Sequence, residues 1–283
     1  MGFLIWETKK IFRDTKTHLG FCVILVFLAL MCLMFKWDPM LKQIAHHCHS
    51  FGIDPHFFMN GYLFCRLSTM MMFLCILPVV ISVSVVGQFA GEESEGFLKT
   101  FVGGPKSRSF IFFQKFIAAV FFAFVYLCLT FFLSWVIGVA VFGRGELVVS
   151  GTNLMTMLAS LRTITESEAV LRIIFSLILS MIAVLPLMGL NILLSVLLGK
   201  PMAALSVTLS FVYGTLIFKF VPFQAFESLG RYFFTSEFYF WGNVFQEVIP
   251  WHLLLEKGLY LTAYAVSFLM LSWGIFQVRD IKS

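Results

Sequence analysis

The stretch Gln88–Lys115 reads QFAGEESEGFLKTFVGGPKSRSFIFFQK, and it separates two long apolar runs of the chain. It holds three glutamates near its start, breaks at Gly103–Pro105, and returns to apolar residues after Lys106 and Arg108. Charge at this density has to lie in water or against another protein, because charge inside a bilayer is costly. The stretch therefore predicts a polar loop at a membrane surface, between two membrane-spanning helices.

The composition of the whole chain is typical of an integral membrane protein. Its 283 residues are 60% hydrophobic and 12% charged, with a formal net charge of +5, whereas soluble domains are about 25% charged. Its six cysteines show no metal-binding or redox spacing. No signal-peptide cleavage pattern follows the basic first residues, so we expect the first apolar run to remain as a span.

Six segments are apolar over about the 20 residues that a helix needs to cross a bilayer. We expect an all-α, multi-pass protein of the cell membrane (the inner or plasma membrane), with residues 1–283 forming a single transmembrane domain. Residues 1–17 predict an amphipathic interfacial helix, with Glu7 and Lys10 on its polar side. A solvated N-terminal helix is the alternative. The predicted spans lie near 18–35, 67–90, 110–142, 170–198, 201–221 and 258–277.

Lysine and arginine indicate the orientation of these spans. Six spans place both termini on one side together with the 91–109 loop, and this side is the denser in Lys and Arg, as cytoplasmic loops are. The segments 143–169 and 222–257 then face outward and are candidates for binding an extracytoplasmic partner. The second is crowded with aromatic residues, which predicts a re-entrant segment before the last span. A loop packed on the outer ends of the helices is the alternative.

The sequence offers little chemistry of its own. The nearest approach to a P-loop, Gly103–Ser107, has Pro105 where a glycine amide would face phosphate. We therefore expect no bound cofactor and no enzymatic activity in this chain. Adjacent side chains cannot all reach one ion, so we expect no metal at the candidate cluster His46, His47, Cys48 and His49. No nucleic-acid partner is expected either.

The polar stretch resembles the loop between the second and third spans in permeases of the ABC-2 class of ATP-binding-cassette transporters. That loop has an acidic residue, Glu-x-x-x-Gly, a hydrophobic stretch, Pro-x-x-Arg and a Lys that opens the next helix. Phe97 departs from the Thr that usually follows the Gly, and two glycines precede the Pro where the family commonly has Leu or Thr. The order of the predicted elements along the chain is also similar, and the permeases of nitrous-oxide-reductase maturation and gliding motility are closest in character. The matching residues here are Glu92, Glu93, Glu95, Gly96, Pro105, Arg108 and Lys115.

The resemblance implies a permease subunit that moves a substrate, by export, when a separate ATPase subunit drives it. Two permeases would pair, as two copies or as paralogues, and a dimer of ATPase subunits would hold ATP-Mg. A coupling helix of about Glu92–Val102 would dock into the ATPase, with carboxylates facing basic groups and apolar side chains filling a groove. A membrane scaffold or assembly subunit, or a self-sufficient carrier, are the alternatives. The residues predicted to dock are Glu92, Glu93, Glu95, Gly96, Phe97, Leu98, Phe101, Pro105 and Arg108.

Overall fold

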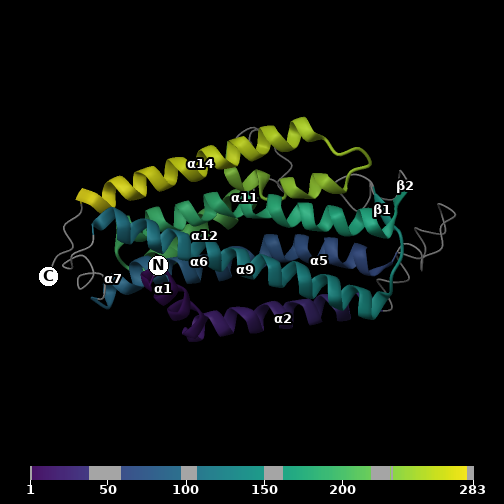
Figure 1. Cartoon of the computed structure of the whole chain (residues 1–283), viewed down its shortest axis with the longest axis horizontal. Helices are drawn as coiled ribbons and strands as arrows, with labels where there is room; N and C mark the ends of the chain where they lie inside the picture. The colour runs from purple at the N-terminus through teal and green to yellow at the C-terminus, as the bar shows by residue number, and fades with distance from the viewer. Residues whose placement is uncertain are drawn as a thin grey trace.

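The computed structural model describes residues 2–37, 59–96, 107–149, 162–217, 230 and 232–278, and these form a bundle of helices (Figure 1). This agrees with the predicted all-α membrane protein. A short antiparallel hairpin, in which Leu147 pairs with Ile164, was not predicted. The helices and strands in chain order are α1 (Gly2–Arg13), α2 (Thr15–Lys36), α5 (Gly61–Cys75), α6 (Leu77–Val86), the π-helical turn η1 (Gly87–Gly91), α7 (Glu92–Ser94), α9 (Arg108–Phe142), β1 (Leu147–Val149), β2 (Arg162–Ile164), α11 (Glu166–Leu198), α12 (Pro201–Ile217), the 3₁₀ turns η2 (Phe234–Glu237) and η3 (Phe240–Phe245), and α14 (Trp251–Val278).

The described helices suit a membrane-embedded protein. Four stretches are long and apolar enough to cross a bilayer, and the pair formed by α5 and Leu77–Ser94, bent by 47°, counts as a fifth if it is one span. The described part of α12 has 17 residues, which is short of the roughly 20 that a crossing needs. The predicted span near 201–221, the fifth along the chain, therefore stays a prediction. The four stretches are Thr17–Lys36, Arg108–Phe142, Glu166–Leu198 and Trp251–Val278.

The second predicted span differs from its prediction at its start. The helix begins at Gly61 rather than near residue 67, because the Asn60 side chain accepts the backbone N–H groups of Tyr62 and Leu63 at 3.1 and 3.0 Å. Such a cap satisfies donors that a helix start leaves open. The bend between α5 and α6 is at Ile76, two residues before Pro78, which lacks the backbone N–H that a continuous helix would use.

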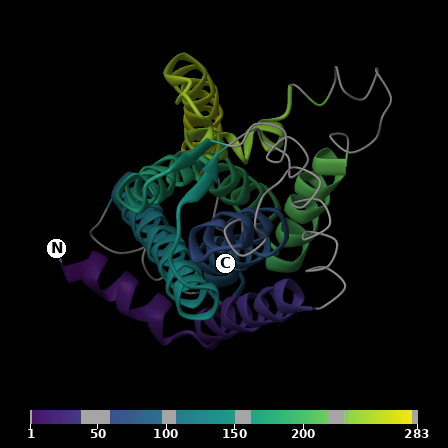
Figure 2. The same ribbon diagram turned by 90° about the vertical axis from the view of Figure 1, so that its right-hand side faces the viewer.

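Close backbone contact holds α5 against α9. A Cβ atom on Gly61 would lie 2.5 Å from the backbone nitrogen of Val139, and one on Gly138 would lie 2.5 Å from the carbonyl oxygen of Gly61. Only glycine fits at such a contact, as is common where membrane helices pack closely. Seen from the hairpin end, α5 lies near the middle of the bundle, with α2 and α14 on opposite sides (Figure 2).

The two ends of the bundle differ in what they carry. Helices α1 and α7 and the last turn of α14 lie toward one end, and the hairpin lies at the other (Figure 1). Near the hairpin end, η2 and η3 are buried among the helices, and the fully buried ring of Trp241 lies 5.2 Å from that of Phe73 and 5.7 Å from that of Phe131. In the described part of the aromatic segment before α14, η3 therefore packs inside the bundle, whereas Tyr232 and Val248 on either side are exposed.

Candidate functional site

Four charged side chains from three separate elements meet at the α1 end of the bundle. Lys115 of α9 is fully buried; its Nζ lies 3.1 Å from Oε1 of Glu7 on α1 and also contacts Oε2 of Glu92 on α7. Nζ of Lys10 on α1 lies 2.9 Å from Oε1 of Glu92. We call these four side chains the ion cluster.

The ion cluster explains why α1 carries two charged residues, Glu7 and Lys10, on one face. Glu7 and Lys10 are three residues apart and so share one face of this helix with Ile11, which is also buried. The predicted interfacial helix placed Glu7 and Lys10 on a polar, water-facing side. In the structure this side turns toward α7 and α9, and Glu7 is only 1% exposed.

The charges in the ion cluster balance, which makes their burial tolerable. Two carboxylates face two ammonium groups, and each buried charge has at least one partner of opposite sign. Burial raises the pKa of Glu7 above its usual value of 4.5; the nearby Lys115 ammonium opposes this rise, and the Glu92 carboxylate adds to it. Removing Lys115 would leave the buried Glu7 carboxylate without an ion-pair partner, so α1, α7 and α9 are held together as a unit.

The π-helical turn η1 leads directly into α7 and places Gln88 beside the ion cluster. The Gln88 carbonyl oxygen accepts a hydrogen bond from Lys115 Nζ at 3.3 Å. Its side-chain amide, on a residue only 6% exposed, has no hydrogen-bond partner among the residues that the structure describes. Single π turns within α-helices are frequent at functional sites.

A small polar cavity of about 80 Å³ lies next to the Gln88 side chain, between α1, α6 and α7. Ile11 and Thr17 contribute to its wall, but charged and amide groups dominate it. The polar side chains that line it and matter for its chemistry are Lys10, Asp14, Ser84, Gln88, Glu92 and Glu95.

The predicted docking residues lie in different surroundings. The Glu92 carboxylate faces the protein interior in the ion cluster, so it is not on a surface that could face a partner. Glu93 is half-buried and Glu95 is exposed. Gly96 has a φ of 78°, a conformation that favours glycine, and the described chain stops there. Phe97, Leu98, Phe101 and Pro105 lie outside the described residues.

Arg108, the last of the predicted docking residues, contacts another helix of the same chain. Its Nη1 donates to the carbonyl oxygen of Gln277, near the end of α14, at 3.0 Å. The start of α9 and the end of α14 are thereby tied together at the same end of the bundle as α7.

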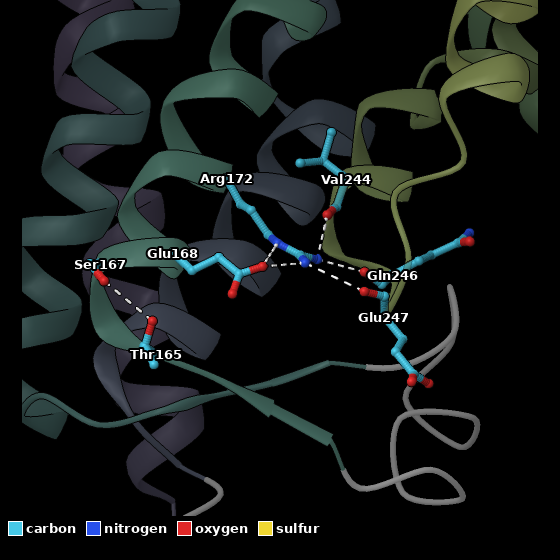
Figure 3. A network of polar contacts seen from close by, with 7 residues as sticks. All are labelled: Thr165, Ser167, Glu168, Arg172, Val244, Gln246 and Glu247. Carbon is cyan, nitrogen blue, oxygen red and sulfur yellow. Dashed lines mark hydrogen bonds and ion pairs between the residues drawn. The ribbon is translucent and has the colours of Figure 1, made fainter.

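A second polar network, which the sequence reasoning missed, lies toward the hairpin end (Figure 3). The Arg172 guanidinium donates to Oε1 of Glu168 and, through Nη1, to the carbonyl oxygens of Val244 at 2.9 Å and Gln246 at 2.5 Å. These bonds fix η3 against α11. The spacing of Glu168 and Arg172, four residues apart on a helix, is the signal that sequence alone offered.

The other candidate sites supply fewer groups that could bind a metal or orient a ligand. The predicted metal candidates His46, His47, Cys48 and His49 lie outside the described residues, and within the described part of the chain no group of three or more His, Cys, Asp or Glu is placed to hold a metal. A cavity of about 350 Å³ between α9 and α11 is lined by apolar residues such as Phe131, Trp135 and Ile173. That lining supplies few polar groups to orient a ligand.

Comparison of the chain with protein-family models, with curated proteins and with solved structures gives no match. What the protein does is therefore inferred from its own residues and their arrangement.

Proposed function

We propose that this chain is the membrane-spanning permease subunit of an ATP-binding-cassette transporter of the ABC-2 class, in the cell membrane. In this proposal it exports a substrate when a separate ATPase binds the 91–109 loop. The resemblance of Gln88–Lys115 to the family's loop and the set of long apolar helices both support it.

The observation that carries the proposal is the ion cluster. A transporter driven from outside the bilayer needs the docking element to be fixed to the helices that must move. Here α7, the first turn of the predicted coupling helix, is held by buried charges to α1 and to the base of α9. Helix α9 has 35 residues and packs along α5 and α11, so a displacement of α7 would be passed deep into the bundle.

The partner would engage the outward side of this element. With Glu92 turned inward, Glu93 and Glu95 remain to face basic groups of the ATPase, and Phe97, Leu98 and Phe101 supply the apolar contact. ATP-Mg would be bound and hydrolysed in the ATPase dimer. A second permease, either another copy or a paralogue, would complete the pathway.

Affinity purification of the tagged protein from its native membrane in mild detergent, followed by mass spectrometry, tests the proposal. We expect a P-loop ATPase in stoichiometric amount. Glu93→Arg and Phe97→Asp should weaken its recovery, because they reverse a charge and bury a charge at the contact. Glu146→Arg, an exposed glutamate near the hairpin, is the matched control. Glu92→Arg is unsuitable as a test, because it would break the ion cluster.

Two outcomes contradict the proposal in different ways. If both docking variants retain the ATPase as well as the wild type does, the docking assignment is wrong. If several mild detergents yield no ATPase with the wild type, the permease assignment is wrong. Transport by the chain alone in liposomes would then favour a self-sufficient carrier, and its absence a scaffold or assembly subunit.

A further inference from the structure

The cavity beside Gln88 contains a buried amide without a hydrogen-bond partner in the described part of the chain and is open to the surroundings, and both features indicate a ligand-binding site. Its Gln88 amide, a good acceptor and donor, is more than nine-tenths buried and has no hydrogen-bond partner among the described residues. A buried amide without a partner costs free energy that a ligand bound there would recover. Asp14 and Glu95, both exposed, also line this cavity and so open it to the surroundings.

The charges around the cavity favour a cation. Ammonium groups on Lys10 and Lys115 are both engaged by carboxylates of the ion cluster. Counting every charged group in the ion cluster and the cavity wall, four carboxylates face two ammonium groups, which leaves a formal charge of −2. The four carboxylates belong to Glu7, Asp14, Glu92 and Glu95.

The size and the chemistry of the cavity narrow the class of cation. A volume of about 80 Å³ holds a few water molecules or a group of a few heavy atoms, far below the roughly 300 Å³ of a drug-sized site. No group of three or more His, Cys, Asp or Glu among the described residues is placed to hold a metal. A cation with several N–H donors fits better, because it can donate to the Gln88 Oε1 and to a carboxylate at once.

We propose that this cavity binds the cationic end of one small organic molecule, a primary ammonium or guanidinium group. Gln88 and Glu95 accept its N–H donors, and Asp14 adds charge at the rim. The inference does not depend on the proposed transport function, because it needs only the isolated chain. The same group can come from a free amine in solution or from the headgroup of a phosphatidylethanolamine lipid.

Carboxylate labelling tests the site with methylguanidinium chloride as the probe. The purified protein in detergent is treated with a water-soluble carbodiimide and a hydrazide, which is uncharged at the labelling pH and so is not itself an ammonium ligand. The modification of each carboxylate is read by peptide mass spectrometry. Methylguanidinium should slow the labelling of Glu95 and Asp14, while sodium chloride and tetramethylammonium chloride at equal ionic strength should not. Glu93 lies on α7, two residues before Glu95, but does not line the cavity; it should stay unprotected and serves as the internal control.

Two variants locate the effect. Gln88→Leu should raise the methylguanidinium concentration for half-protection about tenfold or more, the loss expected for one hydrogen bond to a charged group. Glu95→Gln, at an exposed position where misfolding is not expected, should do the same with Asp14 as the readout. Glu93→Gln should leave the protection unchanged.

The outcomes separate the sources and can overturn the proposal. In vesicles containing phosphatidylethanolamine, protection or a lipid adduct at Glu95 without added probe identifies the headgroup as occupant. In vesicles of phosphatidylglycerol alone, protection only after methylguanidinium is added identifies a free cation. If methylguanidinium protects Glu95 and Asp14 no more than sodium chloride does, or protects Glu93 equally, its effect is general charge screening. Either result would contradict the proposal.

Discussion

Lys115 is the residue on which the ion cluster depends, since it contacts both buried carboxylates. Lys115→Met keeps the apolar stem but leaves Glu7 and Glu92 with Lys10 alone, at an expected cost of about 3–5 kcal/mol. The thermal unfolding midpoint of the purified protein should fall steeply. Lys9→Met, at an exposed position of α1, is the matched control.

A second substitution tests whether an unpaired buried charge causes the loss of stability. Adding Glu7→Gln to Lys115→Met removes the buried carboxylate that has lost its ion-pair partner, so the double variant should regain part of the lost stability. A Lys115→Met protein as stable as the Lys9→Met control would show that the cluster does not hold α1, α7 and α9 together.

Glu7 should make the stability of this end of the bundle depend on pH. Burial raises the pKa of Glu7 in the folded protein above the unfolded value of about 4.5, so the folded state binds a proton more readily than the unfolded state. Its contribution to stability is then fully present below pH 4.5 and is lost as the pH rises through the folded pKa. Glu7→Gln cannot titrate and should lack this component.

Unfolding midpoints of the wild type and of Glu7→Gln, measured from pH 4 to pH 7, check this expectation. The midpoint of the wild type relative to that of the variant should fall as the pH rises. Glu93→Gln, which leaves the ion cluster intact, should follow the wild type. A constant difference between the wild type and Glu7→Gln would mean that burial does not shift the titration of this group.

The sequence indicated which charged residues matter, but it did not indicate in which direction their side chains point. Glu92 and Lys115 stood out as parts of one motif, but Glu92 was expected to face a partner. Its pairing with Lys10 and Lys115 joins residues far apart in the chain. No local pattern encodes such a contact, because it depends on how α1 and α9 approach α7.

The contact between α5 and α9 gives the clearest prediction about whole elements. Gly138→Leu would place side-chain atoms where the Gly61 carbonyl oxygen lies, which forces the two helices apart. Overpacking of this kind costs about 1–3 kcal/mol and occasionally more, and because rigid backbone is the obstacle we expect the upper end. Yield and unfolding midpoint of the purified protein measure the effect.

Gly274→Leu on α14 is the matched control, because a Cβ there meets nothing within 4 Å. This variant should resemble the wild type. Equal behaviour of the two leucine variants would mean that α5 and α9 can separate at little cost.

At the level of elements, apolar runs predicted where the long helices lie. The exact start of a helix depended on its capping residue, which the apolar runs do not show. The first, third and fourth predicted spans match α2, α9 and α11 to within four residues, whereas α14 begins at Trp251, seven residues before the predicted start of the last span. The start of α5 lies six residues earlier than predicted, because Asn60 caps a stretch that includes the polar Arg66. Pro78 lies just after the bend between α5 and α6, whereas Pro186 lies inside α11, which continues to Leu198.

For the whole molecule, the placement of the chain ends makes a testable prediction. The first helix and the end of α14 lie toward the same end of the bundle (Figure 1), and the excess of Lys and Arg on that side predicts that it is cytoplasmic. A fluorescent protein that folds only in the cytosol should be bright at either terminus. A phosphatase that works only outside the cytosol should be active when inserted between β1 and β2.

Phosphatase activity at either terminus would contradict the predicted orientation. An insertion between β1 and β2 that is silent for phosphatase and bright for the fluorescent protein would reverse it. The hairpin end suits such an insertion, because Arg144 and Glu146 there are exposed.

The sequence by itself determined that this is a helical membrane protein, because the length and apolarity of a helix that crosses a bilayer are properties of consecutive residues. It also determined that charge gathers in one loop between two such helices. Only the tertiary structure decided that Glu92 turns inward to Lys115, that α1 presents Glu7 and Lys10 to the bundle, and that Arg172 holds η3. Pairing of buried charges is a property of residues brought together by packing, since each charge is tolerated only where a distant part of the chain supplies its partner.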